Sequence, residues 1–218
     1  MTEIIVKGKK VKTKGLLPEV GATAEPFLLT KTDLSDIGLA DLKGKNIILN
    51  VFPSIDTPVC SASVRRFNTE VTKLKDTVVL CVSLDLPFAH GRFCAAEGIT
   101  NAIAVSAFRH PGFINNYGLV IDEGPLKGLL ARYVVVIDKT GDIIYSEAVT
   151  NVSDEPDYDD VIQFILQTPG KTPAKKTAGK KPTGGKNQLP LDRCTYPATA
   201  EDSRLTNDDE PCDDGRAG

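Results

Sequence analysis

Hydrophobic residues follow two patterns over residues 1–167, and these patterns alternate along the chain. The first pattern is a short apolar run, of the kind found in strands that are buried on both faces. The predicted strands are the hairpin Glu3–Val11, then Phe27–Thr30, Asn46–Phe52, Thr77–Leu84, Ile103–Ser106, Ala131–Asp138 and Ile143–Val149. A tight turn at residues 139–142 joins the last two strands as a second hairpin.

The second pattern is helical spacing of apolar residues between these runs. After Cys60, the residues Val64, Phe67, Val71 and Leu74 recur every three or four positions. Helices are predicted from Cys60 onward and over Ala89–Glu97, Phe113–Tyr117 and Asp157–Gln167. Parallel-type strands joined by helices, followed by a hairpin and a last helix, predict an α/β sandwich of thioredoxin type.

The composition changes at residue 168. The segment TPGKTPAKKTAGKKPTGGK contains no large apolar residue. Residues 169–193 carry seven Lys and Arg against one acid, whereas residues 194–218 carry two Arg against seven acids. Such a segment buries too little surface to offset the entropy of ordering. We therefore expect a domain over 1–167 and a disordered tail over 168–218, in which Cys194 and Cys212 are exposed thiols or pair on oxidation.

The overall charge and the start of the chain limit the possible partners and location. A net charge of −3 gives no electrostatic reason to expect nucleic acid as a partner of the domain. The first residues lack the apolar segment of a secretory signal, and no apolar run approaches the ~20 residues that span a bilayer. These features predict a cytoplasmic protein without a membrane partner. In that compartment, cysteines that pair are more often catalytic or redox-sensing than structural.

Metal binding is not expected. The chain has five cysteines but no C-x-x-C pair, and it has only two histidines. A structural zinc site needs four Cys or His ligands at characteristic short spacings. The sequence therefore predicts neither a metal nor a bound organic cofactor.

Cys60 stands between a buried strand and an amphipathic helix. The first N–H groups of a helix have no intrahelical partners, and the helix dipole favours negative charge at this end. A thiol placed there is stabilised as its thiolate, which is the nucleophilic form. The alternative is that Cys60 is only a small buried hydrophobic residue, as many free cysteines are.

The residues around Cys60 resemble a known family. The order of proline, threonine and cysteine in FPSIDTPVCSASVRRFN resembles the peroxiredoxin active-site pattern, and the longer match resembles the thiol peroxidase branch of atypical two-cysteine peroxiredoxins. The likeness continues through LCVSLDLPFAHGRFCAAEG, GPLKGLLARYVVVID and EPDYDDVIQFI. It thus spans essentially all of residues 1–167.

The resemblance implies a role for five residues. Cys60 would attack a hydroperoxide and become a sulfenic acid, while Thr57 would direct its hydroxyl at the thiolate or the peroxide. Pro53 would wall the site, and Arg132 would favour the thiolate and polarise the peroxide. Cys94 would be the resolving thiol that forms an intramolecular disulfide with Cys60.

The resemblance also implies substrates and partners. It implies reduction of hydrogen peroxide and organic hydroperoxides, with a preference for alkyl or lipid hydroperoxides. A thioredoxin-like dithiol would reduce the disulfide again, and the protein would form a homodimer.

Other interpretations of these residues stay open at this point. Arg132 can merely end a strand, Thr57 can cap the helix, and Cys94 can pack inside its helix. Cys81 lies mid-strand and is interpreted as inert core. The remaining candidates, interpreted as surface residues, are His90, Arg92 and His110.

Two other functions use the same thiol. A non-enzymatic redox sensor would use the Cys60–Cys94 pair to change binding to a partner through the tail. A cysteine hydrolase lacks support, because no histidine is near Cys60 in the sequence.

Overall fold

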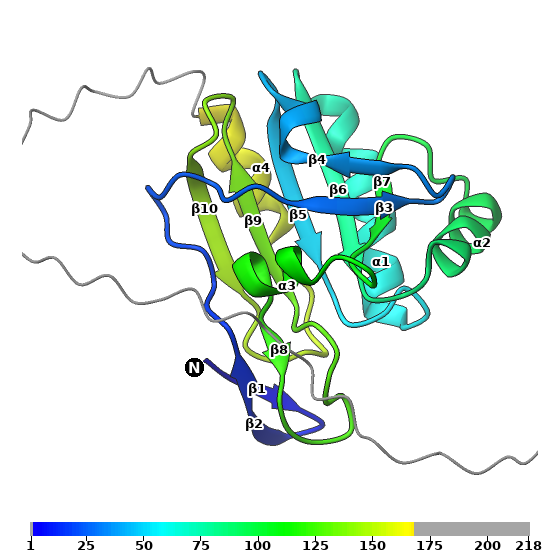
Figure 1. Ribbon diagram of the computed structural model, residues 1–218, viewed down its shortest axis with the longest axis vertical. Helices are drawn as coiled ribbons and strands as arrows, with labels where there is room; N and C mark the ends of the chain where they lie inside the picture. Colours follow the sequence, from blue (N-terminus) through cyan, green and yellow to red (C-terminus); the bar gives the residue numbers. More distant parts are fainter. Residues whose placement is uncertain (1, 168–218) are drawn as a thin grey trace, which may run out of the picture. The chain divides into compact units, whose positions relative to one another are not determined.

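The computed structural model describes residues 2–167; the predicted tail, with Cys194 and Cys212, lies outside the described residues. A seven-stranded sheet forms the centre of this part of the chain, in the order β10-β9-β5-β6-β7-β3-β4 (Figure 1). Its strands are β3 (Leu28–Lys31), β4 (Asp36–Gly38), β5 (Asn46–Val51), β6 (Thr77–Ser83), β7 (Ile103–Ser106), β9 (Tyr133–Ile137) and β10 (Ile143–Ala148). The central strands β5, β6 and β7 are parallel, and all other pairings in the sheet are antiparallel.

A smaller sheet contains the N-terminal hairpin. Its strands are β1 (Glu3–Val6), β2 (Lys9–Lys14) and β8 (Val120–Ile121), in the order β1-β2-β8. Lys7 and Gly8 form the turn, and both have positive φ, as a two-residue type I′ hairpin requires. The predicted hairpin is confirmed. Strands β4 and β8 were not predicted, because two or three residues are too short to show an alternating pattern.

Four helices connect or follow the strands of the main sheet. They are α1 (Pro58–Glu70), α2 (Pro87–Glu97), α3 (Pro111–Tyr117) and α4 (Tyr158–Gln167), with 3₁₀ turns at Leu39–Leu42 and Val71–Lys73. The first three helices begin with proline, whose fixed φ suits the first helical position and whose missing N–H costs nothing there. The helix predicted from Cys60 therefore begins two residues earlier, at Pro58.

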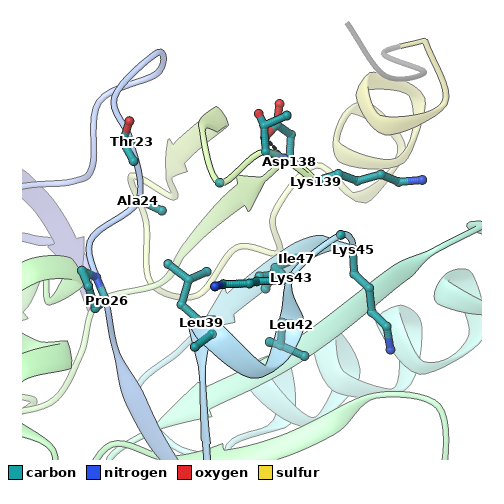
Figure 2. Close-up of a pocket in the computed structure, with 14 residues that line it drawn as sticks. Thr23, Ala24, Pro26, Leu39, Leu42, Lys43, Lys45, Ile47, Asp138 and Lys139 are labelled. Atoms are coloured by element: carbon teal, nitrogen blue, oxygen red, sulfur yellow. Dashed lines mark hydrogen bonds between the residues drawn. The ribbon is translucent and has the colours of Figure 1, made fainter. Parts of the chain in front are cut away.

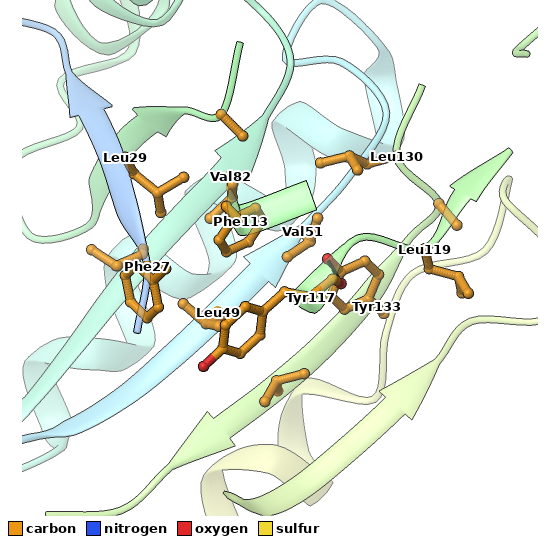
Figure 3. Close-up of a cluster of buried hydrophobic side chains, with 14 of the residues drawn as sticks. Phe27, Leu29, Leu49, Val51, Val82, Phe113, Tyr117, Leu119, Leu130 and Tyr133 are labelled. Atoms are coloured by element: carbon orange, nitrogen blue, oxygen red, sulfur yellow. Dashed lines mark hydrogen bonds between the residues drawn. The ribbon is translucent and has the colours of Figure 1, made fainter. Parts of the chain in front are cut away.

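The two faces of the main sheet are covered by different helices. In Figure 1, α1 and α4 lie behind the sheet and α3 lies in front of it. Alternate residues of β5 divide between the two faces, so that Ile48 packs with α1 and α4 while Leu49 packs with α3. Figure 3 shows the hydrophobic cluster that contains Leu49, in which the rings of Phe113 and Tyr117 from α3 stack on each other. This layering confirms the predicted α/β sandwich.

The strand register brings two distant segments together. β9 pairs antiparallel with β5, and Tyr133 at the start of β9 lies opposite Val51 at the end of β5. Residue 132 therefore lies beside the loop that leaves β5 and leads into α1. No helix between residues 2 and 167 combines the length and the apolar character needed to cross a membrane.

Candidate active site

Cys60 is the third residue of α1 and is completely buried. Thr57 has the extended backbone of an N-cap residue, and Pro58 opens the helix. At the third position, the N–H of Cys60 belongs to the turn that has no intrahelical acceptors. The thiol is packed in the cluster that includes Phe52, Ile55 and Val64. The thiol thus lies at the positive end of a helix, in apolar surroundings that exclude bulk water.

Arg132 is the second component of the site. Its side chain is only 1% exposed, and Nη2 donates a hydrogen bond to the Cys60 sulfur at 3.3 Å. Nε and Nη2 also donate to the Val152 carbonyl, at 3.3 and 3.2 Å. Nη1 is buried and has no hydrogen-bond partner among residues 2–167. A permanent cation is therefore fixed against the thiol, with one N–H donor group left over for a ligand.

Thr57 and Pro53 lie in the loop between β5 and α1. The Thr57 hydroxyl donates to the Ser54 carbonyl at 3.0 Å and forms no capping bond to the helix. Because its hydrogen is used in this way, the hydroxyl oxygen can only accept a further hydrogen bond. Pro53 is buried next to Phe52, at the base of the loop.

The three described cysteines, Cys60, Cys81 and Cys94, are free thiols. Cys94 is half-buried on α2, and burial raises the pKa of its thiol. Cys81 is fully buried on β6, and burial raises its pKa to about 12, with a smaller contribution from the nearby Cys94. Its sulfur accepts a hydrogen bond from Asn50 Nδ2 at 3.6 Å. The structure therefore places Cys81 in the core, on the strand beside the one that leads to Cys60.

Sequence reasoning missed a group of polar residues between the loop and α2. Asp85 accepts hydrogen bonds from the Ser54 hydroxyl and the Ile55 N–H, at 2.9 and 2.6 Å. It also accepts one from Ser83, whose oxygen lies 3.0 Å from His90 Nε2. The signal that was available is the pair of polar residues, Ser83 and Asp85, directly after a buried apolar run.

The prediction that His90 lies on the surface is wrong, because its side chain is fully buried against Ser83. The same prediction fails for His110, whose side chain is 13% exposed and hydrogen-bonds the Thr30 hydroxyl at 2.8 Å. Each histidine finds its partner on a strand of the main sheet, seven residues away for His90 and eighty residues away for His110. Arg92 is exposed as predicted, and it forms an ion pair with Asp56 at 3.0 Å.

Within residues 2–167, no group of three or more His, Cys, Asp or Glu side chains is placed to hold a metal ion. A cavity of about 310 Å³ is lined by Leu39, Lys43, Ile47 and Lys139, among other residues (Figure 2). It lies near the start of β5, whereas the Cys60 loop follows the end of that strand. This cavity is therefore separate from the thiol site.

The geometry of a buried thiol, a helix N-terminus and a fixed arginine agrees with the comparisons to known proteins. The Redoxin family model matches residues 17–162, and the chain therefore belongs to the Redoxin family. A thiol peroxidase of Corynebacterium glutamicum is 48% identical over 159 residues, which cover 73% of this chain and 96% of that protein. Within the family, the chain is a thiol peroxidase of the peroxiredoxin type.

Solved structures support the same assignment. A peroxiredoxin-like protein from Aquifex aeolicus is 35% identical, with a TM-score of 0.71, over 76% of this chain and 96% of that chain. A thiol peroxidase from Chromobacterium violaceum has a TM-score of 0.70 over 76% of this chain and 95% of that chain; at 20% identity it shows the fold alone.

These relations favour a peroxidase enzyme over a non-enzymatic redox sensor. Against a cysteine hydrolase, no histidine among residues 2–167 hydrogen-bonds the Cys60 sulfur.

Proposed function

We propose that Cys60 is the nucleophile that reduces hydrogen peroxide and organic hydroperoxides, with Arg132 as the cation that activates it. The single observation that carries this proposal is the 3.3 Å hydrogen bond from Arg132 Nη2 to the fully buried Cys60 sulfur. In a buried site, a cation beside the sulfur stabilises the thiolate much more than it would in water.

In the first step, the Cys60 thiolate attacks the terminal oxygen of the hydroperoxide. A sulfur–oxygen bond forms and the oxygen–oxygen bond breaks, so that Cys60 becomes a sulfenic acid; the released alkoxide or hydroxide takes up a proton from solvent and leaves as an alcohol or water. The buried Nη1 of Arg132 is available to stabilise the departing oxygen. The Thr57 oxygen is available to accept a hydrogen bond from the peroxide O–H, because its own hydrogen is donated to the Ser54 carbonyl.

In the second step, Cys94 attacks the sulfur of the sulfenic acid. The sulfur–sulfur bond forms, the sulfur–oxygen bond breaks, and water leaves. An external dithiol of the thioredoxin type then reduces the disulfide by thiol–disulfide exchange. Pro53 walls the site, as the sequence predicts, and its burial supports this role. The homodimer, the cytoplasmic location, the preference for alkyl or lipid hydroperoxides and the division at residue 168 stay predictions.

The experiment is disulfide mapping by mass spectrometry after one equivalent of peroxide, combined with steady-state turnover. Turnover is followed as NADPH oxidation with thioredoxin and thioredoxin reductase. C60S should abolish peroxide reduction, and C94S should stop at the sulfenic acid. C81S serves as the matched control and should retain turnover. Peroxide reduction by C60S would refute the nucleophile, and a Cys60–Cys81 or Cys60–Cys194 bridge would refute Cys94 as the resolving thiol.

A further inference from the structure

Asp85 holds the loop that presents Cys60. Asp85 follows β6, and its two carboxylate oxygens accept one hydrogen bond each from Ser54 and Ile55, at 2.9 and 2.6 Å. These two residues lie in the loop between β5 and α1. Hydrogen bonds to a carboxylate are stronger than neutral ones, and two of them fix the loop backbone relative to β6.

Ser83 and His90 continue this contact into α2. The Ser83 hydroxyl donates its only hydrogen to Asp85 at 2.7 Å, while its oxygen accepts the Asp85 N–H at 3.1 Å. The remaining neighbour is His90 Nε2, at 3.0 Å, which must therefore carry a hydrogen and donate it to Ser83. His90 is thus a donor at Nε2, and its Nδ1 is buried without a hydrogen-bond partner among the described residues.

His90 lies on the helix that carries Cys94, four residues before it. Residues four apart lie on the same side of a helix, so the His90 contact holds the part of α2 from which Cys94 projects. A second contact in the same place, the ion pair of Arg92 with Asp56, is exposed and therefore contributes little. Of these two contacts, the buried His90–Ser83 bond is the stronger, and it reaches the Cys60 loop through Asp85.

We propose that the Asp85–Ser83–His90 chain is a latch between the Cys60 loop and α2, and that it limits the rate of disulfide formation rather than the rate of peroxide reduction. This inference rests on the proposed roles of Cys60 and Cys94. The sulfur of Cys60 is enclosed completely, so a second sulfur reaches it only when the loop or α2 opens. The His90 bond must break when α2 leaves its place, whereas it makes no contact with the Cys60–Arg132 pair.

The test compares two substitutions of the same residue. His90→Met keeps the approximate bulk of the side chain and removes the donor, whereas His90→Gln keeps an N–H that can reach Ser83. Stopped-flow kinetics with peroxide should show an unchanged first phase in H90M and a disulfide phase that is roughly three- to tenfold faster, as expected for one lost buried hydrogen bond. H90Q should behave like the parent chain. His110→Met, in the partly exposed hydrogen-bonded pair of His110 with Thr30, is the control and should change neither phase.

Amide hydrogen exchange of the reduced protein gives a second readout that does not depend on the cysteine chemistry. H90M should raise exchange across α2 by a similar factor and leave α4 unchanged. If H90M does not fold, Ser83→Ala removes the hydroxyl that links His90 to Asp85. S83A should then give the same faster disulfide phase and the same increase in exchange across α2. Unchanged exchange in α2 together with an unchanged disulfide phase would overturn the latch. If the parent chain forms no Cys60–Cys94 disulfide, the proposed resolving role fails, and exchange in α2 still tests the latch alone.

Discussion

The Val152 carbonyl accepts two hydrogen bonds from the guanidinium of Arg132, and this contact aims Nη2 at the Cys60 sulfur. The carbonyl itself is fixed by the N-terminal hairpin. Ile5 donates its N–H to the Thr150 carbonyl at 2.7 Å and accepts the Val152 N–H at 3.0 Å. The hairpin, far from Cys60 in sequence, thus sets the position of the cation in the candidate active site.

Replacing Arg132 with Lys should slow the oxidation of Cys60 by roughly 10²- to 10³-fold, the usual effect of losing one preorganised electrostatic group. An ammonium keeps the charge but cannot bond the Val152 carbonyl and the sulfur with the planar geometry of a guanidinium. The measurement is the first phase of peroxide oxidation in stopped flow. Arg109→Lys, at an exposed ion pair with Asp36, is the control. A first phase within threefold of the parent chain in R132K would show that the guanidinium geometry is unimportant.

The hairpin can be tested with one proline. Ile5→Pro removes the N–H that bonds Thr150, so it should loosen residues 150–152 and slow the oxidation of Cys60, with a loss of roughly 1–3 kcal/mol in the free energy of unfolding. The readouts are the same stopped-flow phase and urea unfolding.

Lys10→Pro is the matched control, because Lys10 lies opposite Ile5 in the hairpin. Since the Ile5 N–H points away from β2, this pair is of the non-hydrogen-bonded kind, and the Lys10 N–H also points away from its partner strand. K10P should therefore change neither readout. Equal slowing by I5P and K10P would mean that the hairpin acts through its general stability alone.

The apolar pattern predicted most of the fold because continuous burial leaves a clear signal. Ile103–Ser106 is a strand with the predicted bounds, and the hairpin between β9 and β10 is confirmed. The pattern also gave the position of Cys60 after a buried strand. The start of its helix was predicted two residues late, because the apolar periodicity begins only after Pro58.

The rest of the site depends on contacts between distant segments, which spacing does not reveal. Arg132 comes near Cys60 only because β9 pairs with β5, and its place there followed from the family resemblance. His90 was predicted to be on the surface because a polar residue in a short helix gives no apolar signal. Its partner Ser83 is on another element, and only the folded chain brings the two together.

Cys81 should be unreactive in the folded protein, although it is a free thiol. Burial raises its pKa to about 12, so almost none of it is thiolate at neutral pH. Alkylation with iodoacetamide at pH 8, followed by mass spectrometry, should leave Cys81 unmodified until the protein unfolds. Cys94, which is half-buried, should react before it. Modification of Cys81 at the same rate as Cys94 would contradict its assignment to the inert core.

The stability of α2 should fall in mild acid because of His90. Burial lowers the pKa of His90 below its ordinary value of 6.5, while the charges of Asp85 and Asp56 oppose this shift. The neutral imidazole donates to Ser83, and a proton added at Nδ1 would be buried without an acceptor among the described residues.

In the unfolded or open form, His90 binds a proton near pH 6.5, so that form takes up more protons than the folded one below this pH. The contribution of His90 to stability is therefore complete above pH 6.5 and is lost as the pH falls toward the lowered pKa of the folded state. Hydrogen exchange across α2, corrected for the intrinsic exchange rate, should show more frequent opening at pH 5.5 than at pH 7.5.

H90Q is the control that isolates this effect, because glutamine keeps a donor for Ser83 and does not titrate. The carboxylates with lowered pKa, among them Asp36 and Glu70, also contribute less to the stability of the fold in acid. Their contribution is the same in both proteins and therefore cancels in the difference. The difference between the parent chain and H90Q should therefore be near zero at pH 7.5 and grow as the pH falls below 6.5. A difference that stays constant from pH 5.5 to 7.5 would mean that His90 does not change its protonation when α2 opens.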